Sequence, residues 1–211
     1  MSLLFYAASI MPFQPDIYFQ AFVIIPHMKL PTIEEAHALL DQHVADEYQR
    51  HHARMVATAM LGYAKKFGED EQGQLLWYVT GLLHDVDFDK HPETHPAQSL
   101  GWFKEWGYPD ELIHAVEAHA YGYNGFTTLP QTKLAAALMA CDEMSGIFYA
   151  YKKMNPVPYA QMKASSVKKK FATPTFASRI ERPVIVRGCE ALGVTVDEHI
   201  ANLVSFFAEL E

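Results

Sequence analysis

The chain has 211 residues, half of them hydrophobic, with 17 basic and 25 acidic side chains and a formal net charge of −8. This composition favours one soluble globular domain, and the acidic balance argues against nonspecific binding of nucleic acid or anionic membranes. Two cysteines, Cys141 and Cys189, are too few for a disulfide framework, so we expect a reduced, cytoplasmic protein. The eleven histidines are unusual, because histidine supplies metal ligands and proton carriers near neutral pH.

The first 27 residues differ from the rest of the chain. They are apolar and aromatic, but prolines and an aspartate interrupt them too early for a transmembrane helix. No Lys or Arg precedes Lys29, so the basic start of a secretory signal is also missing. We therefore expect a peripheral extension over residues 1–30, either a docking segment or a start-site artefact. One domain is expected over residues 31–211.

From residue 31 onward, the residues that start and end secondary-structure elements are typical of helices. Thr32 and Glu35 form a capping box that predicts a helix start, and Thr195 with Glu198 repeats it near the C-terminus. Between these signals, glycines and prolines separate stretches of helical periodicity. The predicted helices span about residues 32–44, 48–67, 70–83, 95–106, 109–120, 131–154, 159–170, 183–192 and 196–210. No alternating strand pattern or repeat is present, so the sequence predicts a single all-α bundle of about seven to nine helices.

The most informative segment is residues 81–87, where His84 and Asp85 follow an apolar run. Adjacent residues on a helix point about 100° apart, so such a doublet converges on one ion best at a helix end. The alternative is a polar pair that merely ends a helix.

Two further residues strengthen the metal interpretation. His52 lies early in the second predicted helix, and Asp142 lies in a helix just after the apolar stretch 134–141. A buried carboxylate is costly unless it is paired or bound to a cation, although a lone buried Asp is more often a hydrogen-bonded structural residue. Three helices therefore supply suitable groups in the order His, His-Asp, Asp.

This order and spacing resemble the HD superfamily of metal-dependent phosphohydrolases, a fold of helices named for the His-Asp doublet. The resemblance covers about residues 35–205 and is similar in detail to a bacterial branch of HD-domain hydrolases. The segments that carry it are residues 64–70, 81–85, 140–146, 166–170 and 176–177, together with His52 and Arg182.

The resemblance implies a metal site with the ligands His52, His84, Asp85 and Asp142, with His51 as a less favoured substitute for its neighbour. Mixed imidazole and carboxylate ligands suit Mn, Fe, Co, Ni or Mg better than a structural zinc. One ion is expected. In two-metal members, histidines of the middle region complete a second site, which here would be His95 and His119. Alternatively, these two residues cap a helix and bind a carbonyl, or they contact substrate.

Substrate-binding cations are expected in the late basic motif, at Lys169 and Arg182, although a lysine run is more often a solvated helix face. Asp85 is the expected catalytic carboxylate at the metal. Asp87 and Glu93 crowd the loop after the doublet and are candidates for a general acid or base.

The leading hypothesis is hydrolysis of a nucleotide or another small phosphoester by metal-activated water. The alternatives are an HD-fold diiron oxygenase and a non-catalytic metal- or nucleotide-binding regulatory module. Asp87 stands where signalling phosphodiesterases have Gly, so a cyclic dinucleotide is not supported. No Gly-rich phosphate loop or long basic groove is present, and neither a large nucleic acid nor a membrane is an expected partner. A homodimer is left open.

Overall fold

The computed structural model describes residues 29–210, and it places nine α-helices, two short 3₁₀ helices and no strand in this part of the chain. The expected all-α fold is confirmed. The predicted N-terminal extension falls almost entirely outside the described residues. The elements are α1 (Ile33–His43), α2 (Glu47–Phe67), α3 (Glu71–Leu83), α4 (Ala97–Trp106), α5 (Asp110–His119), α6 (Lys133–Met154), η1 (Tyr159–Gln161), α7 (Ala164–Phe171), α8 (Arg182–Leu192), α9 (Val196–Phe206) and η2 (Phe207–Leu210).

Local sequence signals set most helix boundaries. Thr32 and Thr195 each form the full capping box with the glutamate three residues on. Gly68 ends α2 with φ 77°, a left-handed conformation that glycine adopts without steric cost. These ends follow from the residues within one turn of each boundary.

The predicted helix over residues 159–170 is wrong in its first half. The chain makes a single 3₁₀ turn from Tyr159, becomes extended at Met162 and begins α7 only at Ala164. Tyr159 and Met162 are both buried in the core. Packing of these two side chains therefore overrides the local helical preference.

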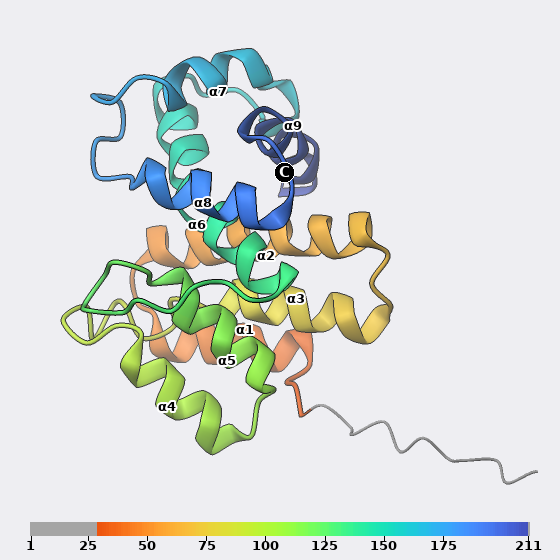
Figure 1. The fold of residues 1–211 in the computed structure, drawn as a ribbon, viewed down its shortest axis with the longest axis vertical. Coiled ribbons are helices and arrows are strands. Elements are labelled where there is room, and N and C mark those ends of the chain that lie inside the picture. Colours follow the sequence, from red (N-terminus) through yellow and green to blue (C-terminus); the bar gives the residue numbers. More distant parts are fainter. Residues whose placement is uncertain (1–28, 211) are drawn as a thin grey trace, which may run out of the picture.

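The central helices α2, α3 and α6 carry the core of the molecule. Figure 1 shows α7, α8 and α9 at one end of the described chain and α4 and α5 at the other, with α2, α3 and α6 between them. Helix α2 packs against α3 and α6, and α6 also packs against α5 and α8. Residues 134–141 of α6 are all buried, so this helix runs through the interior. No helix within residues 29–210 is long and apolar enough to cross a membrane.

Two glycines allow these helices to approach closely. A Cβ on Gly81 of α3 would lie 2.8 Å from the Cα of Ala57 in α2. A Cβ on Gly188 of α8 would lie 2.6 Å from the backbone nitrogen of Ala140 in α6. Both contacts are with backbone, so any side chain at either glycine would push the helices apart. Gly81 and Ala140 are within three residues of the predicted metal ligands. The first contact therefore sets the spacing of the ligand-bearing helices α2 and α3, and the second packs α8 closely against the ligand-bearing helix α6.

Candidate metal centre and its pocket

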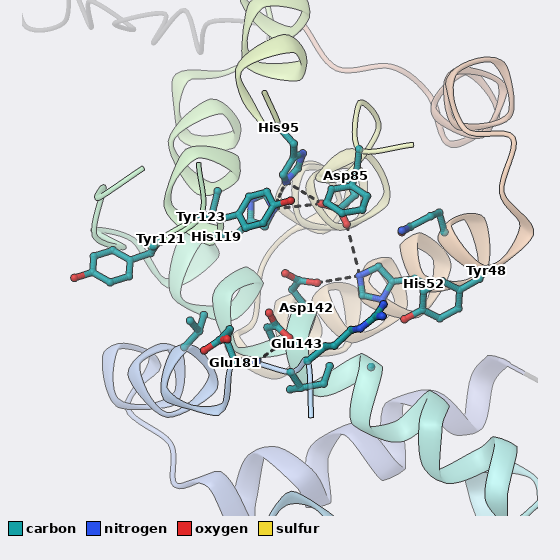
Figure 2. A pocket seen from close by; sticks show the side chains of 18 residues that line it. Tyr48, His52, Asp85, His95, His119, Tyr121, Tyr123, Asp142, Glu143 and Glu181 are labelled. Carbon is teal, nitrogen blue, oxygen red and sulfur yellow. Dashed lines mark hydrogen bonds and ion pairs between the residues drawn. The ribbon is translucent and has the colours of Figure 1, made fainter. Parts of the chain in front are cut away.

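The four predicted ligands meet at one point. His52 comes from α2, His84 and Asp85 from the C-terminal end of α3, and Asp142 from α6, with ligand atoms all within 4.8 Å of one another. Figure 2 shows His52, Asp85 and Asp142 turned toward one another. The doublet converges because His84 is the C-cap of α3 and the chain turns directly after it.

The distances in this cluster leave room for one shared partner. Asp142 Oδ1 lies 2.9 Å from His52 Nε2 and 3.5 Å from His84 Nε2. Asp85 Oδ2 lies 3.4 Å from His84 Nε2 and 3.9 Å from His52 Nε2. Two carboxylate oxygens and two imidazole nitrogens thus surround one position, which is a donor set suited to a divalent cation.

A second cluster shares Asp85 with the first. Its other oxygen, Oδ1, lies 3.3 Å from the Nε2 atoms of both His95 and His119. Those two nitrogens lie 3.3 Å from each other. In Figure 2, His52 lies on one side of Asp85, and His95 and His119 lie on the other. The single carboxylate of Asp85 therefore lies between two groups of possible ligands.

Backbone hydrogen bonds of His84 and His119 determine which ring nitrogen of each residue is free to bind a metal. Nδ1 of His84 donates to the carbonyl of Gly81 at 2.8 Å, and Nδ1 of His119 donates to the carbonyl of Val116. In their neutral forms both rings then present the lone pair of Nε2 to the cluster, as metal-bound histidines do.

His84 provides the sharpest test of the metal interpretation. Its Nε2 atom is buried and has no hydrogen-bond partner. A buried polar atom without a partner is costly, and native structures seldom tolerate one. A cation between His84, Asp85 and Asp142 would satisfy this atom, so the residues present fit a metal.

The charges of the clusters agree with this fit. Burial alone would raise the pKa values of Asp85 and Asp142, but the neighbouring imidazoles lower both well below the usual range. Burial would lower the pKa of His84, yet Asp85 and Asp142 raise it well above 6.5. The carboxylates are therefore ionised and require positive charge beside them, from protons or from a bound cation.

A pocket of about 580 Å³ gives access to both clusters. Five of the six possible ligands line it, and His84 lies behind them. Other parts of its wall are aromatic or acidic, and include Tyr48, Phe88, Tyr121, Tyr123, Glu143 and Glu181. Its volume is that of a small-molecule site.

Glu143 is a pocket residue that sequence reasoning missed. It is mostly buried and follows Asp142 in α6, and its carboxylate accepts a hydrogen bond from the backbone nitrogen of Glu181 at 3.3 Å. Burial, together with the charge of Asp142, raises the pKa of Glu143 to about 8. The sequence does show a second acidic residue directly after the predicted ligand Asp142. Whether the side chain of Glu143 points into the pocket, however, depends on its contact with the loop before α8.

The acid–base candidates of the sequence lie away from the pocket. Asp87 is fully buried and Glu93 is exposed, and neither lines the pocket. Asp87 is nevertheless linked to the second cluster, because its Oδ1 accepts the Nδ1–H of His95 at 2.7 Å.

The structure does not bring the predicted substrate-binding cations to the pocket either. Lys169 is exposed on α7. Arg182 points its guanidinium at backbone carbonyls of the preceding loop and lines a different hollow. His51, the alternative to His52, lies beside the hydroxyl of Tyr159 at 3.3 Å and belongs to neither cluster.

A comparison with protein families gives a match to the part of the chain that holds both clusters. Residues 50–147 match the family model of the HD domain, a span that contains all six residues of the two clusters. Residues 50–147 of the chain therefore form an HD domain, as the sequence resemblance indicated. HD domains are typical of metal-dependent phosphohydrolases. Comparison with curated proteins and with solved structures found no match.

Proposed function

We propose that this protein is a metal-dependent phosphohydrolase that acts on a nucleotide or another small phosphoester. One observation carries the proposal: two clusters of ligand atoms share Asp85 and open onto a pocket of small-molecule size. A purely structural metal site would be closed by its ligands, whereas this one has an open side.

The chemistry expected of such a site is straightforward. When bound, a divalent ion polarises a phosphoryl oxygen and lowers the pKa of coordinated water toward neutrality. His84 and His119 would provide neutral ligands with rings held by backbone carbonyls, the ring of His95 is held by Asp87, and Asp85 provides the carboxylate common to both clusters. Asp142 completes the first cluster and is held by His52 and His84.

The negative charge of the pocket wall also favours a metal-dependent reaction. Asp85, Asp142 and Glu181 all line the pocket, and an anionic phosphoester would be repelled by them in the absence of positive charge. A bound Mn, Fe, Co, Ni or Mg ion would reverse the local potential and make the pocket suitable for such a substrate. One ion would occupy the cluster of His52, and a second would use His95 and His119.

The test is elemental analysis of protein purified without chelator, followed by a phosphate-release screen over nucleotides and small phosphoesters. Asp85→Asn should lose metal and phosphate release together, whereas the exposed control Asp41→Asn should retain both. Metal-loaded wild type that releases phosphate from no ester would contradict the proposal. Metal content unchanged in Asp85→Asn would contradict the site itself.

A second candidate function is oxygen chemistry at a diiron centre. The observation that favours it is that the two clusters together offer six possible metal ligands rather than four, because His95 and His119 lie next to the shared carboxylate of Asp85. Two equivalents of iron and oxygen consumption without phosphate release would support this alternative. Phosphate release supported by Mg, which has no redox chemistry, would exclude it.

A further inference from the structure

The wall of the pocket contains a single Lys or Arg among the described residues, and it is Arg179. This residue lies in the loop between α7 and α8, more than thirty residues beyond the end of the matched family domain. The remaining charged residues of the wall are acidic or are histidines of the clusters. Arg179 is therefore the residue of this chain best suited to meet an anion in the pocket.

A second hollow adjoins the first. It has a volume of about 530 Å³, and it shares part of its lining with the pocket: Tyr48, Gly146, Arg179 and Ile180. Tyr149 and the loop residues Thr175 and Ser178 line its outer part. Arg179 thus lies at the junction of two adjoining hollows, one of which is lined by the possible metal ligands.

The guanidinium of Arg179 has no competing partner. Within residues 29–210 it makes no hydrogen bond and no ion pair, and its side chain is exposed. The other arginine of this loop region, Arg182, is fully engaged with backbone carbonyls. An arginine that is free at a pocket lined by carboxylates is available to a ligand, and its planar fork matches two oxygens of a phosphate or carboxylate.

The backbone that carries Arg179 is held in place on both sides. Arg182 donates to the carbonyl of Phe171 at the end of α7 and to those of four loop residues: Thr173, Phe176, Ala177 and Ile180. Ile180 lies against Gly146 of α6, where a Cβ would be only 2.5 Å from its Cδ1 atom. Directly after it, the nitrogen of Glu181 donates to Glu143. The position of Arg179 is therefore set by the fold, although its side chain reaches into solvent.

We propose that Arg179 binds an anionic oxygen of the phosphorylated substrate at this junction, with Arg182 as the residue that positions its loop. The assignment rests on the proposed function for the identity of the substrate. Because Arg179 also lines the second hollow, a substrate held by Arg179 would lie next to the space beside Tyr48 and Tyr149. The expected substrates are therefore phosphoesters small enough for the two hollows and carrying an anion within reach of Arg179.

The experiment compares wild type with Arg179→Ala and Arg179→Lys, each loaded with the metal found in the purified protein. Binding of inorganic phosphate is measured by calorimetry, and KM and kcat are measured on the ester identified in the screen. Arg54→Ala is the matched control, because Arg54 is an exposed arginine of α2 outside both hollows.

Losing a charged hydrogen-bond donor should weaken phosphate binding and raise KM by about 10- to 100-fold in Arg179→Ala, with a smaller effect on kcat. The phosphate affinity and KM of Arg179→Lys should lie between those of wild type and Arg179→Ala, since lysine keeps the charge but loses the planar guanidinium fork. Metal content should be unchanged in every variant.

Two outcomes would overturn the assignment: metal-loaded wild type that binds no phosphate, or Arg179→Ala with phosphate affinity and KM equal to those of Arg54→Ala. The second result would leave the proposed hydrolase function standing. Arg179-dependent phosphate binding without hydrolysis of any ester would instead retain the binding residue and remove the proposed function.

Discussion

Asp87 and His95 form a buried pair in which Asp87 Oδ1 accepts the Nδ1–H of His95 at 2.7 Å. The second oxygen of Asp87 accepts the backbone N–H of Ser99 at 3.0 Å. With both oxygens occupied and no exposure to the pocket, Asp87 is placed to orient His95 and to keep the Nε2 lone pair of His95 directed at Asp85. This geometry favours a positioning role for Asp87 over direct proton transfer.

Asp87→Asn should therefore weaken the second cluster rather than remove a proton-transfer group. An amide cannot accept from both His95 and Ser99 without turning its NH₂ group toward a donor. We expect a loss of about 10- to 100-fold in affinity for the more weakly bound ion, measured by metal titration. Full metal affinity together with a displaced pH–rate profile would instead favour proton transfer by Asp87.

Metal removal should destabilise the fold through the orphaned nitrogen of His84. An ion that binds only the native state, present at 100 times its Kd, adds about 2.7 kcal/mol to the free energy of unfolding. Chelator should therefore lower the Tm of wild type, and His84→Gln should reduce this chelator-dependent shift. An equal shift in the variant would mean that His84 is not a ligand.

Gly81→Ala should destabilise the protein because its new Cβ would meet the backbone of Ala57. Overpacking of this kind costs about 1–3 kcal/mol, and here it would also displace the end of α3 that carries the doublet. Gly101→Ala is the control, because its Cβ would meet nothing within 4 Å in a helix interior. That variant should gain about 0.5–1 kcal/mol. Denaturant unfolding and metal titration of both variants test this prediction.

His199 should make stability depend on pH. It is fully buried, accepts a hydrogen bond from the hydroxyl of Tyr63 at 2.6 Å and donates to the carbonyl of Ala140 at 3.0 Å. Burial lowers its pKa to about 4 from 6.5. The unfolded chain therefore takes up the proton first as the pH falls below 6.5, and stability is lost progressively between 6.5 and 4.

The predicted loss is about 3 kcal/mol, from a difference of between two and three pKa units. His199→Gln can keep both hydrogen bonds but does not titrate. In metal-free protein, the difference in unfolding free energy between wild type and variant should change across this pH range. A constant difference would show that His199 does not carry the effect.

The sequence was most informative where chemistry is local. The capping boxes, the glycine after α2 and the doublet at the end of α3 depend on neighbours within one turn, and these predictions match the structure. Asp142 is conspicuous in sequence as a carboxylate next to an apolar helical stretch, but its assignment to one site with His52 depends on an order along the chain that resembles a known family.

Local sequence patterns could not show which basic side chains of the C-terminal region reach the pocket. Lys169 and Arg179 are both basic residues of the region after α6, but only the second lines the pocket. Which one does so depends on how the loop before α8 lies on Gly146. Arg182 looks like a substrate cation in sequence, yet the carbonyls of that loop take up its donors.

The shared carboxylate of Asp85 has a thermodynamic consequence. Because its two oxygens face different clusters, filling one cluster fixes the rotation and the charge of the group on which the other depends. The affinities of two cations bound at these clusters would therefore be linked, and each ion would change the affinity of the other by the same factor. Repulsion between two cations opposes joint occupancy, whereas ordering of Asp85 by the first ion favours it. The curvature of a metal titration would give the sign of this coupling.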